Sequence, residues 1–223
     1  MAPLSFDVDV ERVRANLAEV RAEIAAAARQ AGRSPSDVEL LAATKYVSEE
    51  QLGLLAEAGI NLVGENRADA LAAKARRYGD LYTYDFIGTL QSRRVPSIAP
   101  YVRLIHSAAS QSALTVLSRC IDSARPGLAL LIEVNVAGEE SKAGVAPAQL
   151  PALIELAPVP VVGLSTMPPA AKHPEDSRRW FAALRELADS HGLQRLSMGT
   201  TQDYGVAVQE GATIVRIGSR LFA

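Results

Sequence analysis

Three short segments of the sequence carry groups that could bind a phosphorylated carbonyl compound. Lys45 ends an apolar run and offers a primary amine, the group that attacks aldehydes and ketones. Gly199-Thr200-Thr201 and Gly218-Ser219 combine glycines, which let the backbone approach a ligand closely, with hydroxyl and N–H groups that donate to phosphate oxygens. We therefore expect one lysine that reacts with a carbonyl carbon and two loops that hold a phosphate.

Each of these segments also has a simpler explanation. We expect the position of Lys45 to desolvate its amine in part, which lowers the pKa of a lysine and favours its nucleophilic form. A lysine at the end of a strand can also be an ordinary solvated side chain. The stretch Thr201-Gln202-Asp203 could cap a following helix. A helix cap at residues 201–203 would not explain the Gly218-Ser219 pair further along the chain. The presence of both segments therefore favours a phosphate-binding site.

The order of apolar runs along the chain predicts the fold that positions these groups. Short apolar runs alternate with helix-like stretches, which indicates an α/β fold with parallel strands and right-handed crossovers. Eight such runs in a chain of 223 residues are typical of a single (β/α)8 TIM barrel. The predicted strands cover residues 38–44, 61–63, 84–87, 102–105, 128–136, 159–164, 193–198 and 212–217.

The regions outside these strands indicate the domain organisation. Apolar residues three and four apart predict an extra N-terminal helix over residues 7–31, which is expected to cover the face left open by a short last helix. No linker or shift in composition divides the chain, so residues 1–223 are expected to form one domain. An open doubly wound sheet is the alternative fold, but it more often shows a GxGxxG turn after its first strand, and the sequence has none there.

In a parallel barrel the functional groups gather at the carboxyl ends of the strands, so Lys45 should aim its amine into that mouth. Arg216 lies within the eighth strand, and a buried arginine needs a partner, either a carboxylate such as Glu133 or a ligand. Asn66 could contact a ligand, although a helix cap is its simpler role. His106 is expected to be a satisfied histidine at the end of the fourth strand.

The composition is that of a soluble globular protein and argues against several other classes. Hydrophobic residues make up 48% of the chain and the net charge is −2, so no global field favours nucleic acid or an anionic membrane. The single Cys120 excludes a disulfide framework, and the three histidines lack the spacing of a metal site. Without a membrane-length apolar run or the apolar core of a signal peptide, we expect a cytoplasmic protein.

Seven short motifs lie in order at the ends of the predicted strands. They are Leu-Leu-Ala-Ala-Thr-Lys at 40–45, Gly-Glu-Asn at 64–66, Phe-Ile-Gly-Thr-Leu-Gln at 86–91, Glu-Ser-Lys-Ala-Gly at 140–144, Gly-Leu-Ser-Thr-Met at 163–167, Leu-Ser-Met-Gly at 196–199 and Val-Arg-Ile-Gly at 215–218. Taken together, from about Val10 to Phe222, the chain resembles the pyridoxal phosphate homeostasis protein family, whose members are single-domain, alanine-racemase-like barrels.

The resemblance implies that pyridoxal 5′-phosphate (PLP) is held as an aldimine on Lys45, with Asn66 near the cofactor ring. It implies that Arg216 faces the pyridine nitrogen, where a permanently charged arginine disfavours protonation and makes the ring a weaker electron sink. It also implies a set of phosphate-binding residues. These are Ser197, Gly199, Thr200, Thr201, Gly218 and Ser219.

The chain departs from the usual pattern of the family at several positions. The family usually has histidine before Phe-Ile-Gly, where this chain has Asp85. It usually has Asn-Lys where this chain has Arg93-Arg94, which puts any role of that loop in doubt. Thr200-Thr201 replaces Met-Ser, and Ala223 replaces a final glycine. Thr201 keeps a hydroxyl at the family's serine position, so the phosphate assignment is retained.

The resemblance implies a monomeric, non-catalytic carrier that buffers free PLP and delivers it to apo-enzymes. Racemases of the related fold take a second base from an additional β-domain, which this chain lacks. The alternative is an enzyme that uses a Schiff-base lysine, either a weak amino-acid racemase or a class I aldolase. Aldolase lysines commonly lie on later strands, however, and no acid–base carboxylate is obvious beside Lys45. A pure interaction module would be expected to lack Lys45.

Lysine is rare in this chain, so the setting of each lysine is informative. The chain has four lysines and nineteen arginines. Lys74 and Lys172 are expected to be solvated. Lys142 lies in the polar loop 138–144 and could capture PLP transiently during delivery, although a solvated loop lysine is the simpler interpretation.

Overall fold

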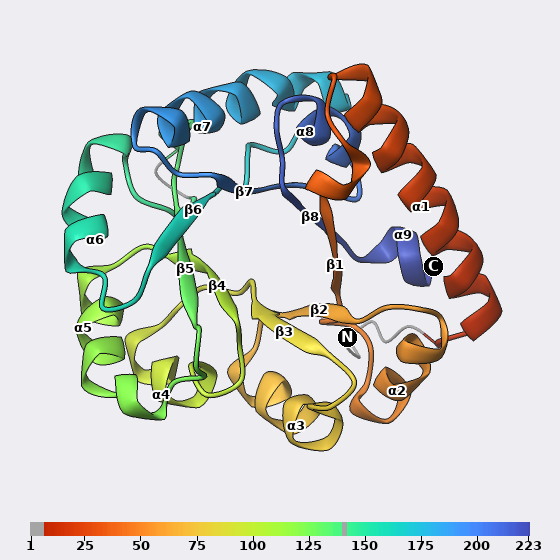
Figure 1. Cartoon of the computed structure of the whole chain (residues 1–223), viewed down its shortest axis with the longest axis horizontal. Helices are drawn as coiled ribbons and strands as arrows, with labels where there is room; N and C mark the ends of the chain where they lie inside the picture. The colour runs from red at the N-terminus through yellow and green to blue at the C-terminus, as the bar shows by residue number, and fades with distance from the viewer. Residues whose placement is uncertain (1–6, 140–141) are drawn as a thin grey trace.

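Eight parallel strands close into a barrel in a computed structural model that describes residues 7–139 and 142–223. Figure 1 looks along the barrel, with the strands in the middle and the helices around them. The strands follow one another around the barrel in chain order, and β8 pairs with β1 to close it. They are β1 (Glu39–Ala43), β2 (Leu62–Glu65), β3 (Thr83–Phe86), β4 (Leu104–Ala108), β5 (Ala129–Glu133), β6 (Val161–Ser165), β7 (Arg195–Thr200) and β8 (Ile214–Ile217).

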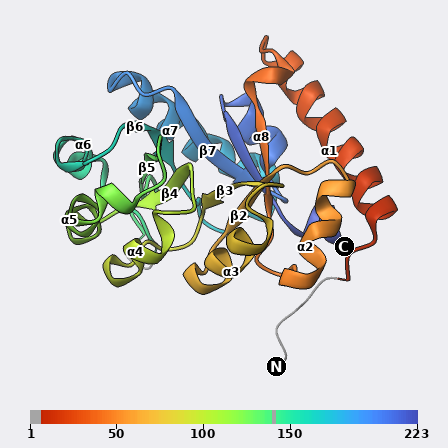
Figure 2. The same ribbon diagram turned by 60° about the horizontal axis from the view of Figure 1, so that its bottom comes forward.

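Helices connect the strands and form the outer layer, as the tilted view in Figure 2 also shows. They are α1 (Val10–Gln30), α2 (Glu49–Glu57), α3 (Ala68–Tyr78), α4 (Val95–Ile98), α5 (Gln111–Arg119), α6 (Leu150–Leu156), α7 (Arg178–Ser190), α8 (Tyr204–Gln209) and α9 (Ser219–Phe222). The prediction of a (β/α)8 barrel with an extra N-terminal helix is therefore confirmed. None of the described helices is long and apolar enough to cross a bilayer.

The first helix covers the side of the barrel on which the chain ends. Its N-cap Asp9 accepts a hydrogen bond from the Arg12 N–H at 3.0 Å, and its apolar stripe is buried. Asn16 donates to the Leu221 carbonyl at 3.2 Å, and Arg220 pairs with Glu19 at 2.8 Å. Through these contacts α1 covers the part of the barrel that a longer helix after β8 would otherwise cover, next to the short α9.

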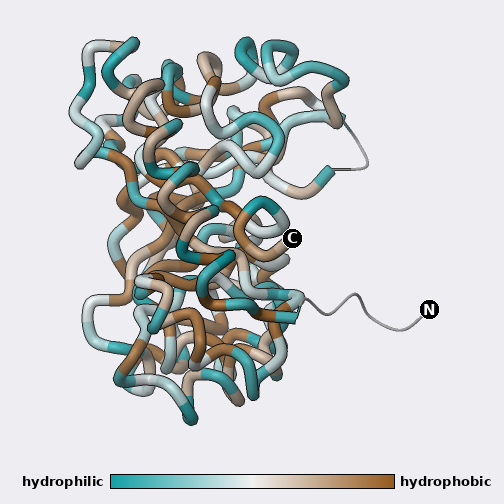
Figure 3. The backbone as a smooth tube through the Cα atoms, turned by 90° about the vertical axis from the view of Figure 1, so that its right-hand side faces the viewer, coloured by the Kyte–Doolittle hydropathy of each residue, from teal (hydrophilic) through white to brown (hydrophobic). Residues whose placement is uncertain are grey.

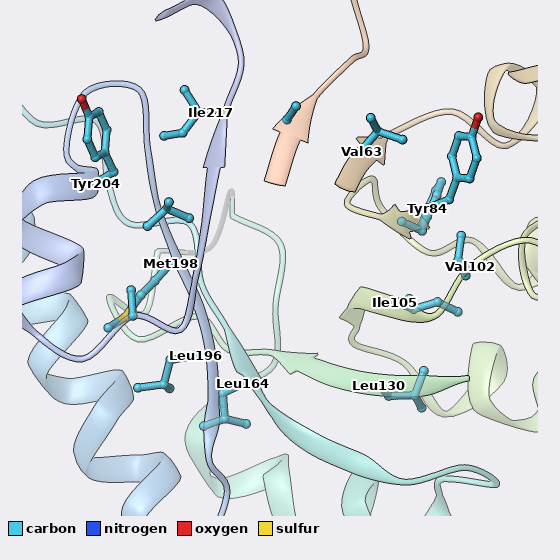
Figure 4. Close-up of a cluster of buried hydrophobic side chains, with 14 of the residues drawn as sticks. Val63, Tyr84, Val102, Ile105, Leu130, Leu164, Leu196, Met198, Tyr204 and Ile217 are labelled. Carbon is cyan, nitrogen blue, oxygen red and sulfur yellow. The ribbon is translucent and has the colours of Figure 1, made fainter. Parts of the chain in front are cut away.

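Side chains alternate between the helix layer and the barrel interior along each strand. The outward-facing residues of the strands form a large apolar cluster with the helices, part of which Figure 4 shows around Ile105, Leu164 and Ile217. In the tube view of Figure 3 the hydrophobic segments run mainly through the middle of the molecule. The positions between the outward-facing residues point into the barrel.

The barrel interior is apolar in one layer and polar in the next. Leu41, Leu62, Leu104, Leu131 and Ile214 form a second, separate apolar cluster. Two residues further along their strands, towards the carboxyl ends, lie polar residues such as His106 and Arg216. Buried polar groups require hydrogen-bond partners, so the residues of this polar layer must bond to one another or to a ligand.

Candidate functional site

The carboxyl ends of β7, β8 and β1 meet at one rim of the barrel, as the sequence predicted for the two glycine-containing loops and Lys45. The Gly218 N–H after β8 donates to the Thr201 hydroxyl after β7 at 3.4 Å. A Cβ placed on Gly218 would lie 3.5 Å from the Ala43 carbonyl oxygen at the end of β1. Lys45 follows two residues later, so this lysine and both glycine-containing segments occupy neighbouring positions on this rim.

Lys45 lies in the turn after β1 and its side chain is exposed. Its Nζ lies 5.0 Å from the centroid of the Tyr46 ring, within the range of a cation–π contact. The sequence predicted partial desolvation of this amine, and that prediction is wrong for this conformation. An exposed amine is accessible to a carbonyl compound from solution.

A buried ion pair supports the backbone just before Lys45. Lys74 is only 4% exposed, and its Nζ donates to the Thr44 carbonyl at 2.9 Å and to a carboxylate oxygen of Glu65. The Thr44 hydroxyl donates to the same Glu65 oxygen at 2.6 Å. The prediction that Lys74 is solvated is therefore wrong, because α3 packs its lysine inward against β1 and β2. The buried pair fixes Thr44, the residue from which Lys45 extends.

The carboxyl end of β7 and the turn after it depend on a glycine and an aspartate, because the strand continues through Gly199 and Thr200, two residues beyond its predicted end. Gly199 has φ +89, and a Cβ at this position would lie 2.5 Å from the Ala207 side chain, so other residues would be strained. The Thr200 N–H donates to Asp203 at 2.8 Å, and the Thr200 hydroxyl lies 3.3 Å from the same oxygen. The N–H and hydroxyl of Thr200 are thus both hydrogen-bonded to Asp203. The Thr201 hydroxyl instead contacts Gly218, which follows β8.

Arg216 lies in β8, in the polar layer of the barrel interior, and is only 8% exposed. It donates to the Ser197 carbonyl at 2.7 Å, to the Ser197 hydroxyl, to the Thr166 carbonyl at 2.9 Å and to the Met167 sulfur at 2.9 Å. Burial lowers the pKa of Arg216 to about 10, while the charges of Glu133 and Asp203 oppose this shift. Arg216 therefore stays charged at neutral pH although no carboxylate accepts a hydrogen bond from it among the described residues.

A second set of buried polar residues lies beside Arg216. The two ring nitrogens of His106 lie 2.8 Å from the Ser197 hydroxyl and 3.1 Å from Asp85. His106 is a satisfied histidine, as predicted, but it occupies the middle of β4 and not its end, because that strand continues to Ala108. Ser197 is fully buried, so its side chain is directed to the barrel interior and away from the two loops.

A cavity of about 570 Å³ opens beside this site, over the ends of β2, β3, β5 and β6. Its lining includes Asn66, Glu133, Lys142 and Met167. Burial raises the pKa of Glu133, although the charge of Arg216 opposes the shift. Asn66 is exposed and does not cap α3, whose N-cap is Arg67 without a side-chain hydrogen bond, so the predicted cap is wrong.

The remaining sequence candidates are exposed at the surface. Ser219 begins α9 and is exposed, and Lys142 is exposed in its loop. Arg94 pairs with Asp69 at 3.0 Å across the loop in which this chain departs from the family pattern. The sequence reasoning missed the contacts of Lys74, Glu65 and Asp203. Strand alternation was an available signal for Glu65 alone, because Glu65 ends β2 whereas Asp203 lies in the turn before α8.

Comparison with known proteins places the chain among proteins named for PLP homeostasis. A protein of Aquifex aeolicus called pyridoxal phosphate homeostasis protein is 39% identical over 217 residues, covering 92% of this chain and 95% of that protein. The Pseudomonas aeruginosa protein of the same name is 38% identical, covering 93% of each chain. A scan against protein-family models found no match.

Solved structures agree with this placement. PipY of Synechococcus elongatus, whose structure has PLP bound, is 28% identical with a TM-score of 0.77, covering 95% of this chain and all of PipY. An arginine decarboxylase of Paramecium bursaria Chlorella virus is 14% identical with a TM-score of 0.66 over 96% of this chain and 63% of the enzyme. The decarboxylase supports the barrel fold alone.

Proposed function

Because this chain belongs to the pyridoxal phosphate homeostasis protein family, we propose that it binds PLP at the rim formed by β1, β7 and β8 and serves PLP homeostasis. One observation carries the placement: the Gly218 N–H contacts the Thr201 hydroxyl, and Gly218 lies beside Ala43 at the base of the Lys45 turn. This supports the proposal, because the residue with an amine for the aldehyde and the donors for the phosphate then belong to neighbouring strand ends.

The donor set at this rim fits the phosphate of PLP. The 3.4 Å contact between Gly218 and Thr201 is long for an N–H···O bond, so the N–H can turn to a phosphate oxygen at little cost. The Thr201 hydroxyl and the backbone N–H of Ser219 add donors. Thr200 contributes mainly through its bond with Asp203, which holds the loop.

Lys45 is the residue that binds the aldehyde carbon of PLP. When PLP is bound, Lys45 would hold its aldehyde carbon through a C=N bond to Nζ, whose formation releases one water molecule. Because the side chain is exposed, the amine can reach the aldehyde and the bond can also be reversed by solvent or another amine. Asn66 lies at the mouth cavity on the other side of the site, where it can contact the cofactor ring.

Arg216 makes the PLP ring a weaker electron sink. A guanidinium can only donate, so a ring nitrogen that accepts from it stays unprotonated. PLP supplies an electron sink for carbanions when its ring nitrogen is protonated, and Arg216 works against that state. This argues for a carrier that delivers PLP to apo-enzymes more than for a racemase. An exposed Lys45 suits exchange of PLP better than the water-excluded chemistry of a racemase or an aldolase.

The test is to add PLP to the purified protein and record its visible absorbance before and after borohydride reduction. We expect a band that reduction fixes as a covalent adduct, which mass mapping places on Lys45. Lys45→Ala should lose the adduct, and Lys142→Ala should keep it. A protein that takes up no PLP, or an adduct on another lysine alone, would overturn the assignment.

The non-catalytic role needs its own measurement. The protein loaded with PLP is incubated with L-alanine, and D-alanine formation is followed over time. We expect no turnover above that of free PLP. Turnover at enzyme-like rates that disappears in Lys45→Ala would replace the carrier role with a racemase.

A further inference from the structure

A continuous line of buried polar side chains crosses the barrel interior and ends at Arg216. Asp85 and Ser197 are fully buried and His106 is 3% exposed. They come from β3, β7 and β4, so two consecutive strands and a third from much later in the chain contribute to one line. Asp85 is also the position at which this chain departs from the histidine usual in the family.

The line continues below Asp85 into a charged cluster. Arg103 donates to Asp85 at 2.9 Å and 3.2 Å with two of its nitrogens. It also pairs with Glu39, to which Arg195 donates at 2.8 Å. Burial alone would raise the pKa of Asp85, but His106 and Arg103 outweigh it and hold that pKa below its ordinary value. Asp85 is therefore a carboxylate and can only accept hydrogen bonds.

The carboxylate determines the direction of every bond in the line. Because Asp85 accepts, the His106 Nε2 that lies 3.1 Å from it must carry the proton. The other nitrogen, Nδ1, then accepts from the Ser197 hydroxyl at 2.8 Å in a neutral ring. The Ser197 oxygen is left to accept from Arg216, which can only donate. Burial lowers the pKa of His106, in agreement with a neutral ring.

The contacts of Arg216 divide into a fixed side and an exchangeable side. On the fixed side, one terminal nitrogen donates to both the carbonyl and the hydroxyl of Ser197. On the other side, the second nitrogen donates to the Thr166 carbonyl and to the sulfur of Met167. A thioether is a weak acceptor, and Met167 is 51% exposed at the mouth. A pyridine nitrogen would accept this N–H better than the sulfur does.

We propose that Asp85, His106 and Ser197 are positioning residues that hold the Arg216 guanidinium so that it donates to the ring nitrogen of PLP and keeps that nitrogen unprotonated. The inference rests on the proposed function, because it assumes that PLP is bound with its ring over Arg216. It adds that the electronic state of the cofactor is set by a line of residues of which only Arg216 would touch the ring.

The experiment loads the protein with PLP labelled with ¹⁵N in the ring and follows the ring nitrogen by NMR between pH 6 and pH 9. In the native protein we expect the shift of an unprotonated, hydrogen-bonded pyridine that does not change with pH. In Ser197→Ala the Arg216 side chain loses its hydroxyl partner. The ring nitrogen should then titrate within this range, and PLP affinity should fall by about tenfold, as expected for a weakened hydrogen bond to a charged group.

Two further variants separate positioning from folding. Ser197→Thr keeps the hydroxyl and should give the native shift. Asp85→Asn keeps the shape of the side chain but places an amide N–H against Arg103 or His106. This change should reverse or break the hydrogen bonds from residue 85 to Arg216, and the ring nitrogen signal should move as it does in Ser197→Ala. Ser177→Ala is the matched control, because it removes another buried serine, at the start of α7 and outside the barrel interior.

The outcomes distinguish this inference from the proposed function. An unchanged, pH-independent ring signal in both Ser197→Ala and Asp85→Asn, with a normal adduct on Lys45, would overturn the positioning role and leave PLP binding intact. Equal changes in Ser177→Ala would overturn it too, because they would reflect general loosening. A native protein that forms no Lys45 adduct would refute the proposed function itself.

Discussion

The two ends of the proposed cofactor site are built in opposite ways. At the β1 end, Lys45 is exposed and its amine lies against the ring of its neighbour Tyr46. At the β8 end, Arg216 is buried and is held by groups from Ser197, Thr166 and Met167. The residue that would form a covalent bond is left accessible, and the residue that would form a single hydrogen bond is held in place.

This difference follows from what each contact requires. A covalent bond to an aldehyde is strong by itself, and a protein that must release PLP benefits from an amine that other nucleophiles can reach. A hydrogen bond to a ring nitrogen is weak unless its donor is preorganised. The rigid parts of the β1 end therefore lie below Lys45, in the pair formed by Lys74 and Glu65.

The largest expected effect tests the accessible end. Lys45→Arg keeps the positive charge but cannot form the C=N bond, so the reducible adduct should disappear completely. Because the side chain is exposed, the free energy of unfolding should change by no more than about 0.5 kcal/mol. Pyridoxine 5′-phosphate, which has no aldehyde, should bind equally well to both proteins in calorimetry. A large drop in its affinity would mean that Lys45 also shapes the pocket.

The next effect tests the support below that end. Lys74→Met leaves the Glu65 carboxylate buried without its cation, and one of its oxygens already has no partner among the described residues. We expect a loss of about 3–5 kcal/mol in the free energy of unfolding, measured by urea denaturation. The double variant with Glu65→Gln removes the stranded charge and should recover much of that loss. No recovery would show that packing of the lysine stem, and not charge, is what matters.

The two glycines of the proposed phosphate site, Gly199 at the end of β7 and Gly218 after β8, should respond differently to the same substitution. Gly199→Ala is strained by φ +89 and by the Ala207 side chain 2.5 Å from the added Cβ, so we expect a loss of about 1–3 kcal/mol. Gly218→Ala finds its nearest neighbours at 3.5 Å and should fold with little loss. Urea denaturation of the two variants side by side measures the contrast. Equal destabilisation would mean that the loop after β8 is as constrained as the loop after β7.

The smallest effect concerns pH and the buried end. The pKa of His106 is lowered in the folded protein, so below about pH 6.5 the unfolded chain binds a proton that the folded chain does not. The stability present above that pH is therefore lost as pH falls, by about 1.4 kcal/mol per pH unit. Asp85, whose pKa is also lowered, adds a further loss below about pH 4.

His106→Gln should flatten the pH dependence between pH 6.5 and pH 5, measured as the free energy of unfolding in urea at each pH. Comparison with the native protein removes the contribution of Glu133, whose raised pKa acts in the opposite direction in both. An identical slope in the two proteins would show that His106 takes up a proton in the folded state and that the line to Arg216 tolerates a charged ring.

Much of the fold and of the rim was readable in the sequence. The alternation of apolar runs with helix-like stretches predicted all eight strands, because buried parallel strands need continuous apolar residues. The sequence singles out Lys45, Gly199 and Gly218 as candidates because barrel sites gather at the carboxyl ends of strands, and the structure places their segments on neighbouring strands.

What the sequence determined by itself is the order of the elements and the kinds of residue at each strand end, since both depend on local spacing. Only the tertiary structure decided the partners: that Lys74 faces Thr44 and Glu65, and that Ser197 faces His106 and Arg216. These contacts join residues up to 91 positions apart. They depend on strand register and helix rotation, which come from the packing of the whole barrel and from no single segment.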